Sequence, residues 1–142
     1  ISRDPLHKES TEEYWRNERY RFFKALSGKT ITAHHLDDVV EWYLFSSLHG
    51  RAKTIPYKRE NVIRPFLTTP KEHLISWCKR KQVPYIIDPS NKDERFMRSI
   101  IRNKIFPEAL RVNPGLRKVV KNMVENDFNQ LQSTNVREIP VC

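Results

Sequence analysis

TITAHHLDDVVEWYLFSSLHG, residues 30–50, decides the fold, because a strand-like apolar pattern changes there into a helical one. Thr30 to Ala33 form a short β-favouring run. The apolar residues that follow recur at helical spacing and predict one buried helix face, made of Val40, Tyr43, Leu44, Ser47 and Leu48. The stretch therefore predicts a strand that leads directly into a helix, as at the ligand-binding edge of an open α/β sheet.

Polar side chains gather at the junction between this strand and helix. Asp38 and Glu41 are three residues apart, so both can face one ligand; His34 comes just before the first turn, and Asp37 is adjacent to Asp38. Two plainer interpretations stay open. The acids stabilise the helix N-terminus while the histidines cap or pack, or His34, His35 and Asp38 bind a metal. No second cluster with ligand spacing follows, so we expect no metal site.

Composition limits the class of protein. The 142 residues usually make one domain, and 38% hydrophobic residues can fill a modest core. A net charge of +9 favours a polyanionic partner such as nucleic acid, although a solvated basic surface without function is the alternative. Cys78 and Cys142 form no CxxC pair, which favours a reducing compartment. No run of about 18 apolar residues exists, so we expect a cytoplasmic protein without a membrane partner.

Helices are predicted on both sides of the opening stretch. The first runs from an N-cap at Ser10 to Leu26 and carries Arg16 and Arg19 one turn apart. Residues 51–60 are expected to form an exposed basic loop, followed by a strand-like segment at 61–64. A further helix is expected from Lys71 toward Val83, with these apolar positions: Leu74, Ile75, Trp77 and Cys78.

The C-terminal part is expected to contain two more helices. One begins near Asp93, has Phe96, Ile100 and Ile101 as candidate inward residues, and is broken by Pro107. The other follows Asn113-Pro114 and runs through Phe128. The first of these carries a stripe that is either an anion-binding row or a solvated helix face, formed by Arg95, Arg98 and Arg102.

Four blocks, in this order, resemble the tRNA(Ile)-lysidine synthases: RNERY at 16–20, HHLDDVVE at 34–41, IRPFL at 63–67 and DPSNKDERFMRSIIRNKIFPEAL at 88–110. The resemblance covers most of the chain. It implies an ATP pyrophosphatase of the PP-loop superfamily and an α/β fold: part of a doubly wound, adenine nucleotide alpha hydrolase-like sheet with a mostly helical C-terminal half. Residues 1–110 are then the C-terminal part of the catalytic domain, and residues 111–142 a terminal helix and polar tail.

The resemblance also implies a two-step reaction. ATP, with Mg²⁺, adenylates the C2 oxygen of the wobble cytidine of an isoleucine tRNA, and the amine of free lysine then displaces AMP. Asp38 and Glu41 match the family's acidic positions and are the candidate catalytic residues, because carboxylates can hold the lysine ammonium and help it lose a proton. The candidate substrate-binding residues are Asp37, Arg19, Arg98 and Arg102. The candidate nucleotide-binding residues are His34 and Arg98.

The sequence also departs from the family pattern. The phosphate-binding loop, Ser-Gly-Gly-x-Asp-Ser, is absent, since Gly28, Gly50 and Gly115 are isolated. Arg98-Ser99 stands where the family has an Arg-Asn pair. The chain thus resembles the later half of the catalytic core, and three explanations stay open: a separate polypeptide carries the loop, the sequence is a fragment, or it is a degenerate relative.

Other functions remain possible alongside the enzyme. The main alternative is a non-catalytic, basic tRNA-binding or scaffold protein that kept the family's surface. A tRNA thiolase of the same superfamily is disfavoured, because the cysteine pairs it would use are missing.

Overall fold

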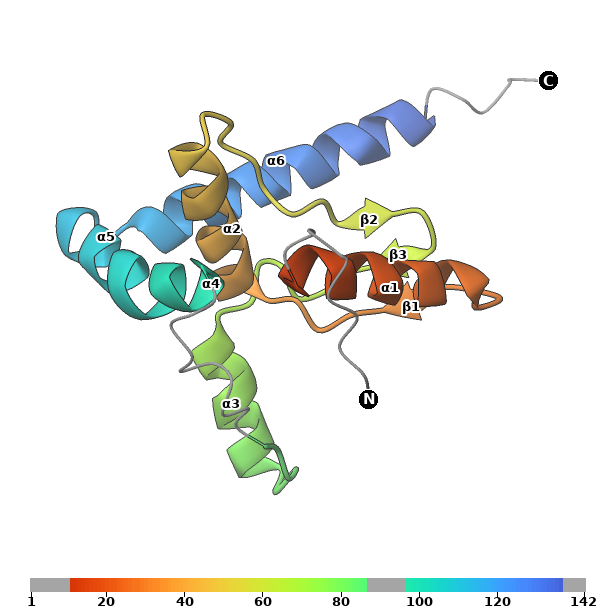
Figure 1. Ribbon diagram of the computed structural model, residues 1–142, viewed down its shortest axis with the longest axis horizontal. Coiled ribbons are helices and arrows are strands. Elements are labelled where there is room, and N and C mark those ends of the chain that lie inside the picture. The colour runs from red at the N-terminus through yellow and green to blue at the C-terminus, as the bar shows by residue number, and fades with distance from the viewer. Residues whose placement is uncertain (1–10, 87–96, 137–142) are drawn as a thin grey trace.

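The computed structural model describes residues 11–86 and 97–136 (Figure 1). Its helices are α1 (Thr11–Ala25), α2 (Leu36–Leu48), α3 (Lys71–Arg80), α4 (Met97–Ile100), the π-helical turn η2 (Ile101–Ile105), α5 (Phe106–Val112) and α6 (Leu116–Val136). Its strands are β1 (Thr30–Ile31), β2 (Lys58–Arg59) and β3 (Val62–Ile63). The predicted α/β class is confirmed, with most described residues helical.

The three strands form one small mixed sheet in the order β1-β3-β2. β1 pairs in parallel with β3, Thr30 opposite Val62, and α2 lies in the crossover between them. β2 pairs antiparallel with β3, so Lys58 and Arg59, which we expected in an exposed loop, belong to the sheet. The predicted strand before α2 is shorter than expected, although the Thr32 N–H still donates to the Ile63 carbonyl at 3.0 Å.

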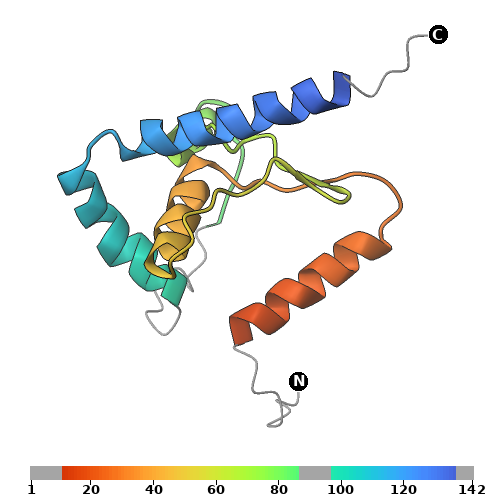
Figure 2. The same cartoon turned by 90° about the horizontal axis from the view of Figure 1, so that it is seen from above.

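Helices flank this sheet, with α6 on one side and α1 on the other (Figure 2). The core lies between α2, α5 and α6, and it contains Leu36, Val39, Val40, Leu67, Phe106, Leu116, Val120 and Val124. The predicted burial of α2 residues is therefore confirmed for Val40 and, in part, for Tyr43 and Leu44, which are half-buried against the core. It is wrong at Ser47 and Leu48, which are exposed because the last turn of α2 extends past the helices that cover its first turns.

Pro107 does not break the helix there, contrary to the prediction. It occupies the first turn of α5, where a missing N–H costs little. The wider turn η2 precedes it, and the Phe106 N–H bonds to the Ile101 carbonyl five residues back. Ile101 and Phe106 are buried, whereas Ile100 is exposed, so only the second of the two predicted inward isoleucines is right. Ser10, Asp93, Arg95 and Phe96 lie outside the described residues.

The remaining helices form near their predicted positions. α3 projects from the body of the molecule and buries none of its residues, so its predicted apolar positions are at most half-buried. α6 packs on α2 through residues of the shared core. The division of the chain after residue 110 stays a prediction.

Val120 and Val119 offer a test of this core. Val120 is fully buried and Val119 is 45% exposed, one position along α6. Val120→Ala should lower the free energy of unfolding by about 2 kcal/mol through lost packing. Val119→Ala is the matched control, because both changes alter helix propensity equally. Urea denaturation of the two variants measures the difference, and equal stabilities would contradict the assigned core.

Candidate functional site

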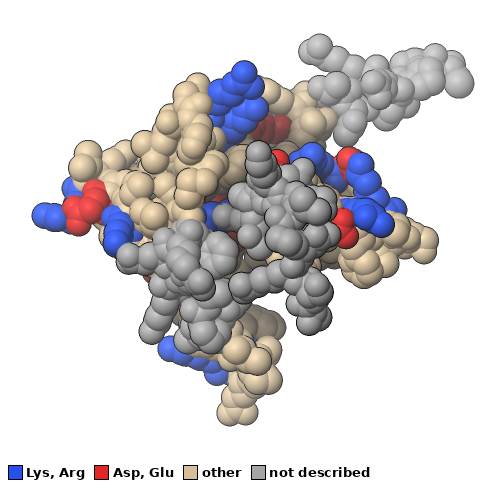
Figure 3. Space-filling model, in the orientation of Figure 1, with Lys and Arg blue, Asp and Glu red and all other residues tan. Residues whose placement is uncertain are grey.

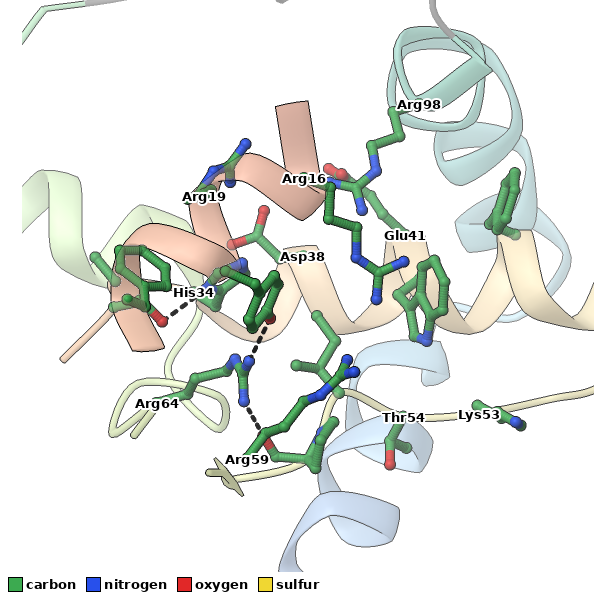
Figure 4. A pocket seen from close by; sticks show the side chains of 18 of the residues that line it. Arg16, Arg19, His34, Asp38, Glu41, Lys53, Thr54, Arg59, Arg64 and Arg98 are labelled. Carbon is green, nitrogen blue, oxygen red and sulfur yellow. Dashed lines mark hydrogen bonds between the residues drawn. The ribbon is translucent and has the colours of Figure 1, made fainter. Parts of the chain in front are cut away.

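A cleft of about 670 Å³ lies between α1 and α2 (Figure 4). Both helices contribute lining residues, and so do residues 53–56 of the segment that connects α2 to β2. Five of the predicted site residues line it: Arg19, His34, Asp38, Glu41 and Arg98. Residues distant in the sequence thus meet at the head of α2.

The first turn of α2 fixes Asp38. The Asp38 carboxylate accepts a hydrogen bond from the His35 N–H at 2.9 Å, and the His35 ring accepts one from the Asp38 N–H at 3.3 Å. This reciprocal cap satisfies donors at the helix end that have no partner within the helix. The plainer interpretation of this stretch is therefore correct for His35. For Asp38 it is only part of the account, because that side chain also faces the cleft.

Arg102 joins the predicted acidic pair. Its Nε and Nη2 donate to the two Glu41 carboxylate oxygens at 2.7 and 2.9 Å, and Nη2 lies 3.6 Å from an Asp38 oxygen. The hydrogen bond with Glu41 raises the pKa of Arg102 above its ordinary value. Asp38 and Glu41 therefore face one cation, as their spacing predicts, and that cation is a guanidinium of the same chain.

Asp37 faces away from this pair. One carboxylate oxygen accepts the Lys71 N–H at 2.8 Å, and the other pairs with the Arg117 guanidinium at 2.8 Å. It does not line the cleft. Asp37 thus links α2 to the first residue of α3 and to α6, and its predicted contact with substrate stays a prediction.

His34 lies at the start of the cleft and is held by Thr32, whose hydroxyl is 2.9 Å from the ring Nδ1. Burial lowers the pKa of His34 below 6.5, and the cations Arg64, Arg98 and Arg19 lower it further, although Asp38 opposes them. This lowered pKa favours the neutral form of the ring. A neutral imidazole can donate or accept one hydrogen bond toward a ligand without adding to the charge of the cleft.

Arg64 is a site residue that sequence reasoning missed. Only 2% of it is exposed, yet it lines the cleft. Its guanidinium donates to the Pro56 carbonyl at 2.8 Å and to the Tyr20 hydroxyl at 2.6 Å, and Nε is buried without a partner (Figure 4). It takes part in no ion pair within the described parts of the chain. The sequence did contain a signal for it: Arg64 directly follows the apolar strand residues Val62 and Ile63 and belongs to the block IRPFL.

Cations outnumber acids around the cleft. Among the described residues, only two carboxylates line it, those of Asp38 and Glu41, against six basic side chains: Arg16, Arg19, Lys53, Arg59, Arg64 and Arg98. Basic side chains are also more numerous than acidic ones on the face shown in Figure 3. Such a field attracts polyanions and raises their local concentration.

The described residues contain neither a metal cluster nor a membrane-spanning helix. Within residues 11–86 and 97–136, no cluster of His, Cys, Asp and Glu has the three members needed to hold a metal ion. Over the same residues, no helix combines the length and the apolar character needed to cross a membrane.

Comparison with known proteins gives a family for this arrangement. The family model of the PP-loop domain matches residues 2–109. A tRNA(Ile)-lysidine synthase of Thermosipho africanus is 31% identical over 84% of this chain and 30% of its own length. Those of Persephonella marina and Francisella tularensis are 34% and 29% identical, over 77% and 92% of this chain. The chain spans only about a third of the length of these curated relatives, 26% to 37%.

The PP-loop domain has the adenine nucleotide alpha hydrolase-like fold that the four sequence blocks implied. The match extends over most of the chain and includes α1, α2, the sheet and the residues that line the cleft. The resemblance is thereby confirmed, and this chain belongs to the PP-loop domain family.

Proposed function

We propose that this chain supplies the amine-binding and arginine-rich part of a tRNA(Ile)-lysidine synthase-type ligase. The C2 oxygen of a cytidine attacks the α-phosphorus of ATP and pyrophosphate leaves. The amine of lysine then forms a bond to C2, loses a proton, and AMP leaves with the former C2 oxygen. The observation that carries this proposal is the meeting of an acidic pair with an arginine-lined cleft at the head of α2.

The acidic pair suits the lysine step. Arg102 bridges Asp38 and Glu41, which supports the view that the two carboxylates can hold one organic cation between them. A lysine ammonium has an ordinary pKa of about 10.4, so it must be both held and deprotonated before it attacks. In this proposal the ammonium binds at the same carboxylates, next to Arg102 or in its place.

The arginines suit the adenylation step. Arg64 is a buried cation without an acidic partner among the described residues, and an incoming phosphate would offset its charge. Arg19 and Arg98 line the same cleft and provide forked donors for phosphate oxygens. The phosphate-binding loop of the family is supplied by a separate polypeptide or by another part of a longer chain. Mg²⁺ bound to ATP would neutralise part of the phosphate charge beside these arginines.

A second candidate function is a tRNA-binding or scaffold relative without catalysis. The observation in its favour is the same ion pair, because Arg102 already neutralises Glu41 and contacts Asp38. In that case the acids stabilise the packing of η2 on α2 and take no part in chemistry.

Replacing each carboxylate of the acidic pair with its amide distinguishes the ligase from the non-catalytic relative. Asp38→Asn still accepts the His35 N–H, and Glu41→Gln still accepts one bond from Arg102, so both variants keep the local structure. In a mixture with the polypeptide or segment that carries the phosphate-binding loop, each should lower lysine-dependent AMP release about a hundredfold or more. Binding of tRNA should be unchanged.

The matched control for this experiment is Glu108→Gln on α5. Glu108 is an exposed carboxylate that pairs only with Arg111 in the described structure and lies away from the cleft lining. Its activity should equal that of the wild type. Full lysine transfer by both amide variants at the acidic pair would refute their catalytic role, and loss of tRNA binding together with activity would favour a structural one.

Arg64→Met tests the anion-binding role of the cleft. Loss of one phosphate-contacting charge should weaken tRNA binding. It should also reduce the slope of log K for tRNA binding against log salt concentration by about one. Arg80→Met removes an equal charge from the exposed end of α3, and it should leave the salt dependence nearly unchanged. Tyr20→Phe controls for the lost link to α1, because it removes only the hydroxyl partner of Arg64. Identical salt slopes for Arg64→Met and the wild type would overturn the assignment.

A further inference from the structure

A row of aromatic rings runs along α2 to its C-cap residue His49, and the first two rings face the cleft. Trp42 and Phe45 are stacked, with centroids 5.6 Å apart and planes at 25°, and the His49 ring is 4.3 Å from that of Phe45. Trp42 and Phe45 line the cleft, and neither belongs to the core cluster or packs against it. The rings therefore have no packing role that the core of the described structure requires.

Arg16 covers Trp42, the ring of this row that is nearest to the acidic pair, from the opposite wall of the cleft. Its guanidinium carbon lies 5.6 Å from the centroid of the Trp42 ring, and Figure 4 shows the side chain pointing from α1 into the cleft. Arginine over an indole ring is a cation–π contact of modest strength at a partly exposed site. A flexible side chain in this place can move aside for a flat ligand and then meet its phosphate.

The combination of flat rings and cations selects one ligand chemistry. Nucleobases stack on aromatic side chains, and their phosphates pair with nearby basic groups. Here Trp42 and Phe45 share one cleft with Lys53 and Arg59. An unpaired nucleobase with its phosphate fits both features, whereas a base inside a duplex has both faces covered by the neighbouring base pairs.

The charge around the rings favours RNA over a mononucleotide. Six basic side chains of the described residues line the same cleft and can meet the successive phosphates of a strand: Arg16, Arg19, Lys53, Arg59, Arg64 and Arg98. Because Trp42, Phe45 and His49 already pack on one another, a base that displaces Arg16 from Trp42 would continue one existing stack. We propose that Trp42 is the stacking platform for an unpaired base of the RNA substrate, with Phe45 and His49 extending the surface toward solvent. This inference rests on the proposed function and adds where an unpaired base of the RNA substrate binds in the cleft.

The placement of Trp42 gives the platform a role in the reaction. Trp42 follows Glu41 directly and lies one turn after Asp38 on the same helix. A base stacked there is held next to the carboxylates that receive the amine in the proposed reaction. Trp42 is thus a positioning residue, and it makes no hydrogen bond or charge contact with the reacting atoms.

Intrinsic fluorescence can report this contact directly. Trp42 becomes the sole indole when Trp15 and Trp77 are replaced by Phe in the full chain. A hairpin RNA with a single-stranded, cytidine-containing loop should quench its emission. A fully paired duplex with the same stem should bind through its phosphates and leave the emission nearly unchanged.

Substitution of Trp42 should separate stacking from charge. Trp42→Leu should weaken hairpin binding about tenfold, as expected for the loss of one stacked base, while duplex binding and the salt slope stay as in the wild type. Trp42→Phe should retain most of the affinity because a flat ring remains. Trp15→Leu is the matched control, since Trp15 is 59% exposed on α1 and does not line the cleft.

Each other outcome has a distinct meaning. If Trp42→Leu weakens binding of AMP but not of the hairpin, the stacked base is that of the mononucleotide and the RNA assignment is overturned. Equal losses for hairpin and duplex would also overturn it, because they indicate a structural role. Unchanged hairpin binding in Trp42→Leu refutes this inference alone. Failure of the wild-type chain to bind the hairpin refutes the proposed function as well.

Discussion

Adjacent carboxylates at the head of α2 organise this molecule, because they are directed to opposite sides of the helix. Asp37 pairs with Arg117 and accepts the Lys71 N–H, which fixes α6 and the start of α3 against α2. Asp38 and Glu41 face the other side and pair with Arg102, which fixes η2. Both Asp37 and Glu41 are buried, and a buried carboxylate is tolerated only when it is paired. The ion pairs that place the helices thus also place the cleft.

The π-helical turn η2 explains how Arg102 reaches the acidic pair while the same segment packs in the core. Ile101 and Phe106 are five residues apart, which in an α-helix would turn them roughly 140° away from each other. In the wider π turn they can share one side, and both are buried. Arg102, next to Ile101, then faces Glu41. Single π turns of this kind are often found at functional sites.

Local features of the site were predictable from sequence, and long-range ones were not. The spacing of Asp38 and Glu41 is a property of one helix, so their common direction followed from the pattern. The different direction of Asp37 depends on Arg117, eighty positions away, and no local pattern contains it. Arg64 was missed for the same reason, since its burial results from the sheet and its partners Tyr20 and Pro56.

The errors in the fold have a similar origin. The missing N–H of proline predicted that Pro107 would end a helix, and an α-helical period predicted that Ile100 would face inward. Both predictions failed where the backbone changes to a π turn. Leu48 was expected in the core because it continues the apolar stripe, but α2 extends past its neighbours. Periodicity gives the phase of a helix, whereas the extent of its burial depends on what packs against it.

The charges of the cleft connect the two halves of the proposed reaction. Without a ligand, Arg102 is the cation held by the acidic pair, and Arg64 has no acidic partner in the described structure. A phosphate that enters among these arginines offsets the uncompensated charge and offers Arg102 an alternative partner. Any weakening of the contact between Arg102 and Glu41 exposes carboxylate oxygens to a second cation. In the proposed function, the anionic adenylate therefore precedes the amine, because its charge makes room for the ammonium at Asp38 and Glu41.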